Sequence, residues 1–302
     1  MNLKTRIAGF IVSVSIAAGL AHAQEITQSY RGLTLNANLN MAADKTLADG
    51  VILITHAGLA TRSMELYGYL QKLLAEKGYS SLAINLGLGL NNRHGMYDCN
   101  VTHRHHYDDA AGEIGAWVDW LNKHGGRHLV LLGHSRGGAE TALYAAQQDS
   151  PLVDAVVLLA PDTRESNDAV VYQQRYKKSL AAVLEKAQKL VAAGKGSSVL
   201  AHTDFLYCPD TSVTADTFIS YYGSDPRLDT AYLIPQIKQQ ILVVLAGSDE
   251  IVVNDKKIVP LADGKRVQLK VVDGADHFFR DLNADDAVEA IDAYLKSADY
   301  GK

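Results

Sequence analysis

Residues 128–147 read HLVLLGHSRGGAETALYAAQ and combine three local patterns in one order. The run starts with apolar residues typical of a buried strand, passes through a glycine-rich turn and ends in a helix-forming segment. The turn has the spacing G-x-S-x-G at 133–137, which predicts a sharp bend with Ser135 at its tip. Small residues are needed two positions before and after the serine, because the backbone passes too close there for a side chain.

Strand-like and helix-like segments alternate along most of the chain. Apolar, β-branched runs predict strands at Val51–Thr55, Ser80–Asn85, His128–Gly133, Val153–Ala160, Ile241–Ala246 and Val267–Val272. Apolar residues at three- and four-residue spacing predict helices at Ser63–Lys77, Tyr107–Lys123, Arg136–Gln148 and Ala284–Ser297. This alternation predicts an α/β fold: a mostly parallel sheet covered by helices on both faces. Ligands of such folds bind outside the carboxyl ends of the strands, so functional residues are expected there.

Three strand ends carry the residue types that nucleophilic catalysis requires. Ser135, Asp249 and His277 each follow a predicted strand, in this chain order. A serine hydroxyl is a poor nucleophile until a base removes its proton, and a histidine oriented by a carboxylate is such a base. The pattern therefore predicts Ser135 as nucleophile, His277 as base and Asp249 as acid. The backbone amide of Arg136, at the start of the next helix, is expected to bind a developing oxyanion.

The chain resembles the α/β-hydrolase superfamily, in particular its serine esterases and lipases, whose nucleophile, acid and histidine follow three different strands. The resemblance covers nearly all of the chain after position 23. It implies a second oxyanion donor in the loop that reads HAGLA from His56. We expect this donor to be the amide of Gly58, with Leu59 as the alternative, and expect His56 to organise the loop. Some members place the acid after an earlier strand, which makes Asp162 a second candidate beside Asp249.

Residues 161–238 interrupt the alternation, and we expect them to form a helical cap inserted into the main domain. A helix of about 25 residues is predicted around Asn167–Ala193, because its apolar residues fall on one face. Tyrosine rings combine apolar contact with a polar tip, which suits the wall of a ligand site; ordinary packing is the alternative. The tyrosines concerned are Tyr172, Tyr176, Tyr207, Tyr221, Tyr222 and Tyr232.

Residues 1–23 have the pattern of a secretory signal peptide. Two basic residues precede an apolar stretch at 7–20, and AHA at 21–23 has the small-x-small pattern of a cleavage site. The apolar stretch falls short of the roughly 20 residues that a bilayer requires, which argues against a retained membrane anchor. We therefore expect cleavage after Ala23, a mature hydrolase domain at 24–302, and a periplasmic or secreted protein with no stable membrane anchor.

The chain has two cysteines, Cys99 and Cys208. In an oxidising compartment an even number of cysteines is free to pair. We predict a Cys99–Cys208 disulfide that ties the loop around Cys99 to the cap. Two isolated thiols are the alternative, because sequence alone does not give the geometry that a bridge requires.

A loop rich in imidazoles and carboxylates precedes the helix predicted at Tyr107–Lys123. It contains Asp98, His103, His105, His106, Asp108 and Asp109. These side chains are the usual zinc ligands of hydrolases, so a zinc-dependent hydrolase is a rival interpretation. The spacing does not reproduce a motif such as H-E-x-x-H, and Asp108 and Asp109 suit the first turn of a helix. We expect no metal and no cofactor, and assign the loop to the wall of the pocket beside Ser135.

Composition limits the partners of this chain. The 302 residues include 29 basic and 34 acidic side chains, a formal charge of −5, which offers no electrostatic footprint for nucleic acid.

The expected function is an exported serine hydrolase that acts on a small acyl substrate, by default a carboxylic ester, through an acyl-enzyme. Thioesters, amides and peptides use the same chemistry. A non-catalytic binding protein on the same fold remains a further alternative, and the oligomeric state is left open.

Overall fold

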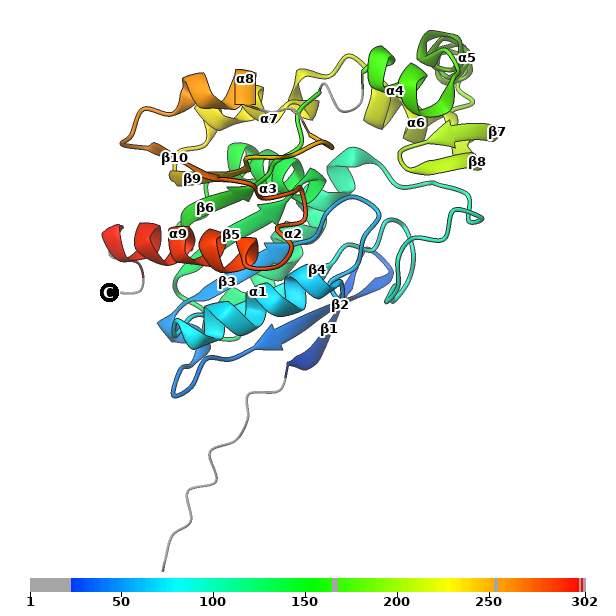
Figure 1. Ribbon diagram of the computed structural model, residues 1–302. Coiled ribbons are helices and arrows are strands. Elements are labelled where there is room, and N and C mark those ends of the chain that lie inside the picture. The colour runs from blue at the N-terminus through cyan, green and yellow to red at the C-terminus, as the bar shows by residue number, and fades with distance from the viewer. Residues whose placement is uncertain (1–22, 165–167, 253–254, 299, 301–302) are drawn as a thin grey trace, which may run out of the picture.

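The computed structural model describes residues 23–164, 168–252, 255–298 and 300, so the predicted signal peptide lies outside the described residues except for Ala23. An eight-stranded sheet forms the centre, in the order β1-β2-β4-β3-β5-β6-β9-β10 (Figure 1). The six strands β4, β3, β5, β6, β9 and β10 run parallel to one another, whereas β1 and β2 at one edge pair in antiparallel fashion. Their bounds are β1 Gln24–Tyr30, β2 Leu33–Asn40, β3 Val51–Thr55, β4 Ser80–Asn85, β5 Leu129–His134, β6 Val153–Leu159, β9 Gln240–Ala246 and β10 Val267–Val272.

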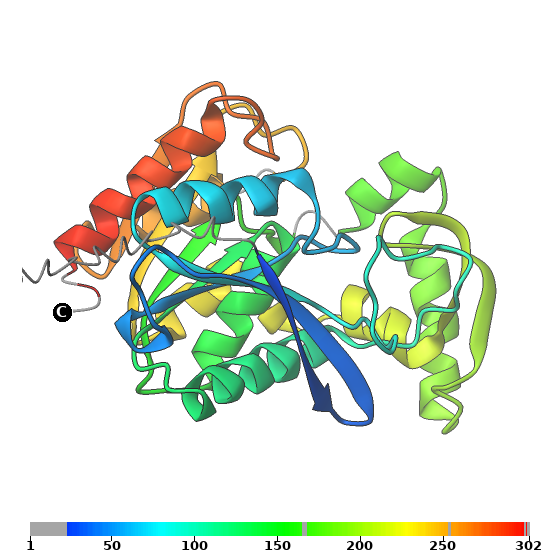
Figure 2. The same ribbon diagram turned by 90° about the horizontal axis from the view of Figure 1, so that it is seen from below.

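Two pairs of helices cover the two faces of the sheet (Figure 2). Helices α1 (Glu65–Glu76) and α9 (Asn283–Ser297) pack together on one face, and α2 (Tyr107–Lys123) and α3 (Arg136–Gln147) on the other. The central strands β3, β5, β6 and β9 are largely apolar without alternation because both of their faces are buried. The predicted α/β class with helices on both faces is confirmed. None of the described helices is both long and apolar enough to span a bilayer.

The edge strands β1 and β2 lie outside the six predicted strands. The sequence of β2 nevertheless alternates strictly between apolar and polar residues, from Leu33 to Asn40. Its apolar residues Leu35, Ala37 and Leu39 face the core. This period of two is the pattern of a strand with one buried face, so the signal for β2 is present in the sequence.

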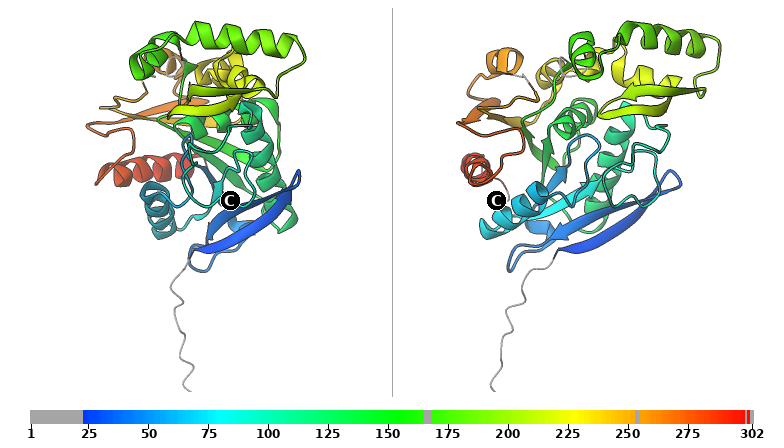
Figure 3. Two further views of the ribbon diagram at one scale, coloured as in Figure 1. Left: turned by 90° about the vertical axis from the view of Figure 1, so that its right-hand side faces the viewer. Right: turned by 45° about the vertical axis from the view of Figure 1, so that its right-hand side comes forward.

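The segment between β6 and β9 leaves the main sheet and forms its own layer (Figure 3). It contains α4 Ala169–Tyr176, α5 Leu180–Ala192, β7 Val199–Phe205, β8 Cys208–Thr214, α6 Ala215–Tyr222 and α7 Thr230–Leu233. Helix α8 (Asp255–Ile258) follows β9, and short 3-10 turns occur at Leu47–Asp49, Pro226–Leu228, Ile234–Gln236 and Val259–Leu261. We call the segment at 161–238 the insertion; it combines helices with a two-stranded antiparallel sheet of β7 and β8.

The single helix predicted around Asn167–Ala193 is wrong. Asn167 lies outside the described residues, and from Asp168 onward the structure has two helices in place of one. Helix α4 ends because Lys177 adopts a left-handed conformation with φ of 58°. A left-handed residue ends a helix, since the next amides no longer meet the carbonyls one turn back. The apolar face of the sequence therefore belongs to two short helices.

The insertion is fastened to the loop between β4 and α2. Cys99 of this loop and Cys208 of β8 form a disulfide, which confirms the predicted pairing. Beside it, the Thr211 hydroxyl donates to the Cys99 carbonyl over 2.5 Å. His103 forms a parallel bridge with Val213, and its amide donates to the Ser212 carbonyl. One covalent bond and a short backbone ladder thus hold the loop against the hairpin.

Removing the disulfide should destabilise the protein. The bridge joins residues 109 positions apart, so it restricts the unfolded chain strongly. We expect the double variant Cys99→Ala/Cys208→Ala to lose about 2–5 kcal/mol of unfolding free energy, measured by urea denaturation. Reduction of the wild type should produce the same shift. Equal denaturation midpoints for oxidised wild type and double variant would contradict the prediction.

Candidate active site

Ser135 lies at a strained turn between β5 and α3. Its backbone has φ of 57° and ψ of −124°, a conformation rarely adopted by residues with a side chain. A Cβ at Gly133 would lie 2.3 Å from the Gly137 carbonyl oxygen, and one at Gly137 would lie 2.3 Å from the His56 carbonyl oxygen. Neither site has room for any side chain. The two glycines of G-x-S-x-G are therefore required by close backbone contacts on both sides of Ser135.

The structure brings Ser135, His277 and Asp249 together in one hydrogen-bonded line. His277 Nε2 lies 2.8 Å from Ser135 Oγ, and His277 Nδ1 lies 2.7 Å from Asp249 Oδ2. A carboxylate oxygen only accepts, so Nδ1 carries the proton and donates it to Asp249. With His277 neutral, Nε2 is then the acceptor and faces the Ser135 hydroxyl. This tautomer is the one able to take a proton from the serine.

The Asp249 carboxylate is held in its charged form. Burial raises its pKa, but the hydrogen bond from His277 and those from the backbone amides of Val252 and Ile251 outweigh this effect, so the pKa lies below the usual value. The two amides donate to Oδ1 at 2.9 and 2.8 Å and leave Oδ2 for His277. The turn after β9 therefore fixes both the charge and the orientation of the carboxylate.

Asp162, the second candidate for the acid, contacts a different side chain. Its Oδ2 lies 3.3 Å from Arg136 Nη2, and both side chains are buried. Its backbone amide donates to the Ser135 carbonyl over 2.9 Å. Asp162 thus supports the turn and neutralises the Arg136 guanidinium, whereas His277 Nδ1 donates its hydrogen bond to Asp249.

The loop after β3 lies against the start of α3. His56 is buried; its Nε2 accepts from the Leu86 amide over 3.0 Å, and its Nδ1 lies 3.2 Å from the Ala57 carbonyl oxygen. Burial and the nearby Arg93 lower the pKa of His56 to about 3, so the ring stays neutral and holds the loop in place. Gly58 has φ of 33°, and a Cβ on it would lie 3.9 Å from Arg136 Nε. Both expected oxyanion donors therefore belong to segments in contact beside Ser135.

Of the six insertion tyrosines, Tyr176 packs edge-on against Tyr172 and Tyr232 is exposed; the other four divide into two groups. Tyr172, Tyr221 and Tyr222 are buried and pack edge-on in an aromatic cluster around Phe205, which is ordinary packing. Tyr207, at the turn of the β7–β8 hairpin, is 42% exposed, and its ring lies 3.3 Å from the position of a Cβ on Gly58. Tyr207 is thus the insertion tyrosine placed over the loop after β3.

The three histidines expected as rival zinc ligands form a buried pair and a separate surface residue. His103 and His105 are buried with 3.2 Å between their Nδ1 and Nε2 atoms, and His105 Nδ1 lies 2.8 Å from the Tyr221 hydroxyl. His106 instead lies near Asp109 and Asp216 at the surface. Across the described residues, no three His, Cys, Asp or Glu side chains are arranged to hold a metal ion. The loop packs into the aromatic core of the insertion.

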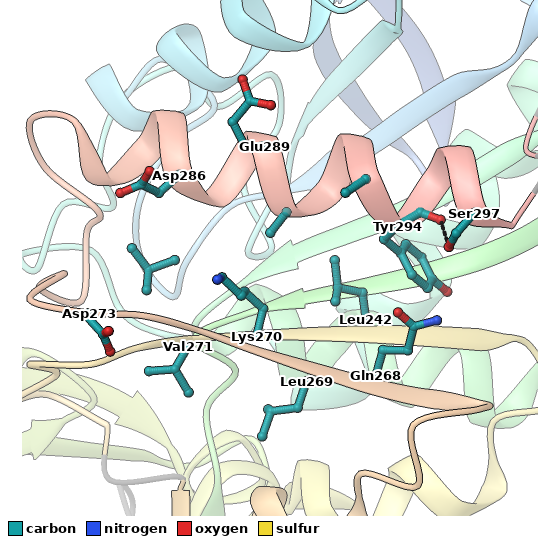
Figure 4. Close-up of a pocket in the computed structure, with 13 residues that line it drawn as sticks. Leu242, Gln268, Leu269, Lys270, Val271, Asp273, Asp286, Glu289, Tyr294 and Ser297 are labelled. Atoms are coloured by element: carbon teal, nitrogen blue, oxygen red, sulfur yellow. Dashed lines mark hydrogen bonds between the residues drawn. The ribbon is translucent and has the colours of Figure 1, made fainter.

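Among the grooves formed by the described residues, two are lined in part by α9. A groove of about 710 Å³ lies between α9 and the edge strand β10, lined by residues such as Lys270, Asp286 and Tyr294, away from Ser135 (Figure 4). Another of about 760 Å³ lies beside the His277 loop and is lined by Met64, Phe278 and other residues at the starts of α1 and α9.

The comparisons with known proteins agree with this architecture. A family model described as alpha/beta hydrolase fold matches residues 50–284, and the chain belongs to this family. No curated protein matches the sequence.

Three solved structures share the fold at low sequence identity. Est1E from Butyrivibrio proteoclasticus is 17% identical, with 91% of this chain and 98% of that chain covered and a TM-score of 0.62. The esterase domain of a Rhodothermus marinus protein is 16% identical, with 93% and 100% covered and a TM-score of 0.60. The monoacylglycerol lipase of Paleococcus ferrophilus is 18% identical, with 87% and 99% covered and a TM-score of 0.58.

Replacing the acid tests the assignment of Asp249 directly. In Asp249→Asn the amide oxygen still accepts, but the amide also offers N–H groups that favour the wrong tautomer of His277. We expect kcat for an aryl ester to fall by about 10⁴ while the fold persists. Asp273→Asn, an exposed change at the end of β10, is the matched control and should retain wild-type kcat. An Asp249→Asn enzyme within tenfold of wild type would refute the assignment.

The buried Glu140 of α3 should make the thermal stability of the protein depend on pH. Burial raises the pKa of Glu140 from 4.5 to about 8, although the charge of Arg136 opposes this. The folded state therefore binds the Glu140 proton more tightly than the unfolded state does. This preference stabilises the fold fully below pH 4.5, and the stabilisation is lost as the pH rises to 8. Glu140→Gln removes this loss. We expect its Tm relative to wild type to increase between pH 5 and pH 8. The exposed change Glu76→Gln should give a constant difference, and a constant difference for Glu140→Gln would count against the prediction.

Proposed function

We propose that this protein is a serine hydrolase that cleaves carboxylic esters through an acyl-enzyme. One observation supports the proposal above all others. The Ser135 hydroxyl lies 2.8 Å from the imidazole of His277, whose opposite nitrogen donates a hydrogen bond to the buried carboxylate of Asp249. This arrangement lets a neutral imidazole take the serine proton in the first chemical step. The esterase and lipase names of the structural neighbours support an ester as the substrate bond.

The proposed reaction begins with transfer of the Ser135 proton to His277 Nε2 as Oγ attacks the ester carbonyl carbon. Asp249 stabilises the imidazolium that forms. His277 then gives this proton to the leaving alkoxide, which departs as an alcohol and leaves the acyl group on Oγ. Water then adds to the acyl carbonyl carbon as His277 Nε2 takes its proton. Collapse of the second tetrahedral intermediate breaks the bond to Oγ, His277 returns the proton to Oγ, and the carboxylic acid leaves.

We assign the oxyanion to two backbone amides. The first is the amide of Arg136, at the N-terminus of α3, where the helix dipole favours negative charge. The second is the amide of Gly58, with Leu59 as the alternative. The packing of the loop after β3 against Gly137 supports this pairing, because it places the two segments side by side next to Ser135.

We also propose that the protein is exported and that the insertion forms one wall of the substrate site. The Cys99–Cys208 disulfide supports export, since such bonds persist in oxidising compartments. The position of Tyr207 over Gly58 supports the wall, because a substrate bound at the oxyanion site meets this ring.

Labelling with a fluorophosphonate tests the chemistry independently of the natural substrate. The probe should attach to Ser135 and abolish hydrolysis of aryl esters, with the modified residue located by peptide mass spectrometry. Ser135→Ala should resist the probe and lower kcat by several orders of magnitude, about 10⁶ where other serine hydrolases are a guide. Ser150→Ala, a change on the loop before β6, should behave as wild type. Full esterase activity in Ser135→Ala would overturn the proposal.

A further inference from the structure

His134 is a fully buried histidine next to the nucleophile that the hydrolytic mechanism leaves without a role. It is the last residue of β5, and its ring lies beneath the His277 loop, with 5.0 Å between the two ring centroids. Its Nε2 is 2.8 Å from the backbone carbonyl oxygen of His277, and its Nδ1 is 3.0 Å from the Tyr67 hydroxyl. Tyr67, on α1, is also fully buried.

The partners of His134 determine where each proton lies. A carbonyl oxygen only accepts, so His134 Nε2 carries a proton and donates it to His277. Burial and the neighbouring His277 lower the pKa of His134 to about 3, so the ring is neutral and Nδ1 accepts from the Tyr67 hydroxyl. The Tyr67 oxygen in turn accepts from the Ala57 amide over 2.7 Å. The chain of donors therefore runs in one direction, from Ala57 through Tyr67 and His134 to His277.

This chain of hydrogen bonds joins three segments of the proposed site. Ala57 belongs to the loop after β3 that precedes Gly58, and His134 adjoins Ser135. The far end is the backbone of His277, whose side chain is already held by Asp249. Asp249 orients the imidazole but does not fix the peptide that bears it. The hydrogen bond from His134 supplies that second point of attachment.

We infer that His134 is a positioning residue: it holds the backbone of His277 so that Nε2 stays within reach of Ser135, and Tyr67 orients His134 for this task. The inference rests on the proposed serine hydrolase function. Burying an imidazole costs free energy unless both of its nitrogens are hydrogen-bonded. Both nitrogens of His134 have such partners, the Tyr67 hydroxyl and the His277 carbonyl.

Substitutions that differ only in their hydrogen bonds test the role. In His134→Leu both bonds are lost, and we expect kcat for an aryl ester to fall roughly tenfold to a hundredfold, with KM within about twofold. In His134→Gln the side-chain amide restores a donor near the His277 carbonyl, and kcat should recover to within about threefold of wild type. Tyr67→Phe should lower kcat in the same direction as His134→Leu. His128→Leu, a change just before β5 at its other end, should keep wild-type kcat.

A double-variant cycle separates positioning from a general loss of structure. In the background His277→Ala, adding His134→Leu should leave the residual rate unchanged, because the group being positioned is gone. A further tenfold loss in that background, or equal losses for His134→Gln and His134→Leu, would overturn the inference. Ser135→Ala is assayed alongside. An active Ser135→Ala would contradict the proposed function itself. An inactive Ser135→Ala together with wild-type kcat in His134→Leu would contradict only the role of His134.

Discussion

The strained backbone of Ser135 is the constraint on which the rest of the site depends. A residue with φ of 57° costs about 1–3 kcal/mol, and it persists only where its surroundings fix it. Here its amide donates to the Leu159 carbonyl of β6, and its carbonyl accepts from the amides of Gly138 and Asp162. Glycines at 133 and 137 allow these close approaches. The central sheet, the start of α3 and the beginning of the insertion thus all contribute to holding one hydroxyl toward His277.

The residue after the serine links the site to the insertion. Arg136 is buried, pairs with Asp162 and lies over the Tyr221 ring at 5.7 Å. The same aromatic cluster contains His103 and His105 of the loop that the disulfide ties to β8. His103 and His105, two of the rival zinc ligands considered from the sequence, therefore pack in this cluster, and the insertion is continuous with the base of the site. Buried contacts with the main domain therefore hold the insertion, and with it the proposed substrate wall, in place.

Much of the architecture follows from local sequence patterns. Central strands such as β3 and β5 are apolar on both faces and bounded by turns, and the three residues now found in one hydrogen-bonded line all follow predicted strands. The hairpin of β7 and β8 was not predictable in the same way, because residues such as His202, Asp210 and Pro209 break any regular alternation. The end of α4 depends on the left-handed Lys177, a residue type without a turn preference. The contact of Tyr67 with His134 spans 67 positions, and no local pattern encodes it.

The proposed mechanism depends on a covalent acyl group forming on one hydroxyl. Rapid mixing with a nitrophenyl ester, followed by an acid quench and mass spectrometry of intact protein and peptides, measures this directly. We expect a burst of nitrophenolate equal to the enzyme concentration and an acyl adduct on the peptide that contains Ser135. Steady turnover without a burst, in enzyme that carries no adduct at any quench time, would contradict it, as would an adduct on a different residue.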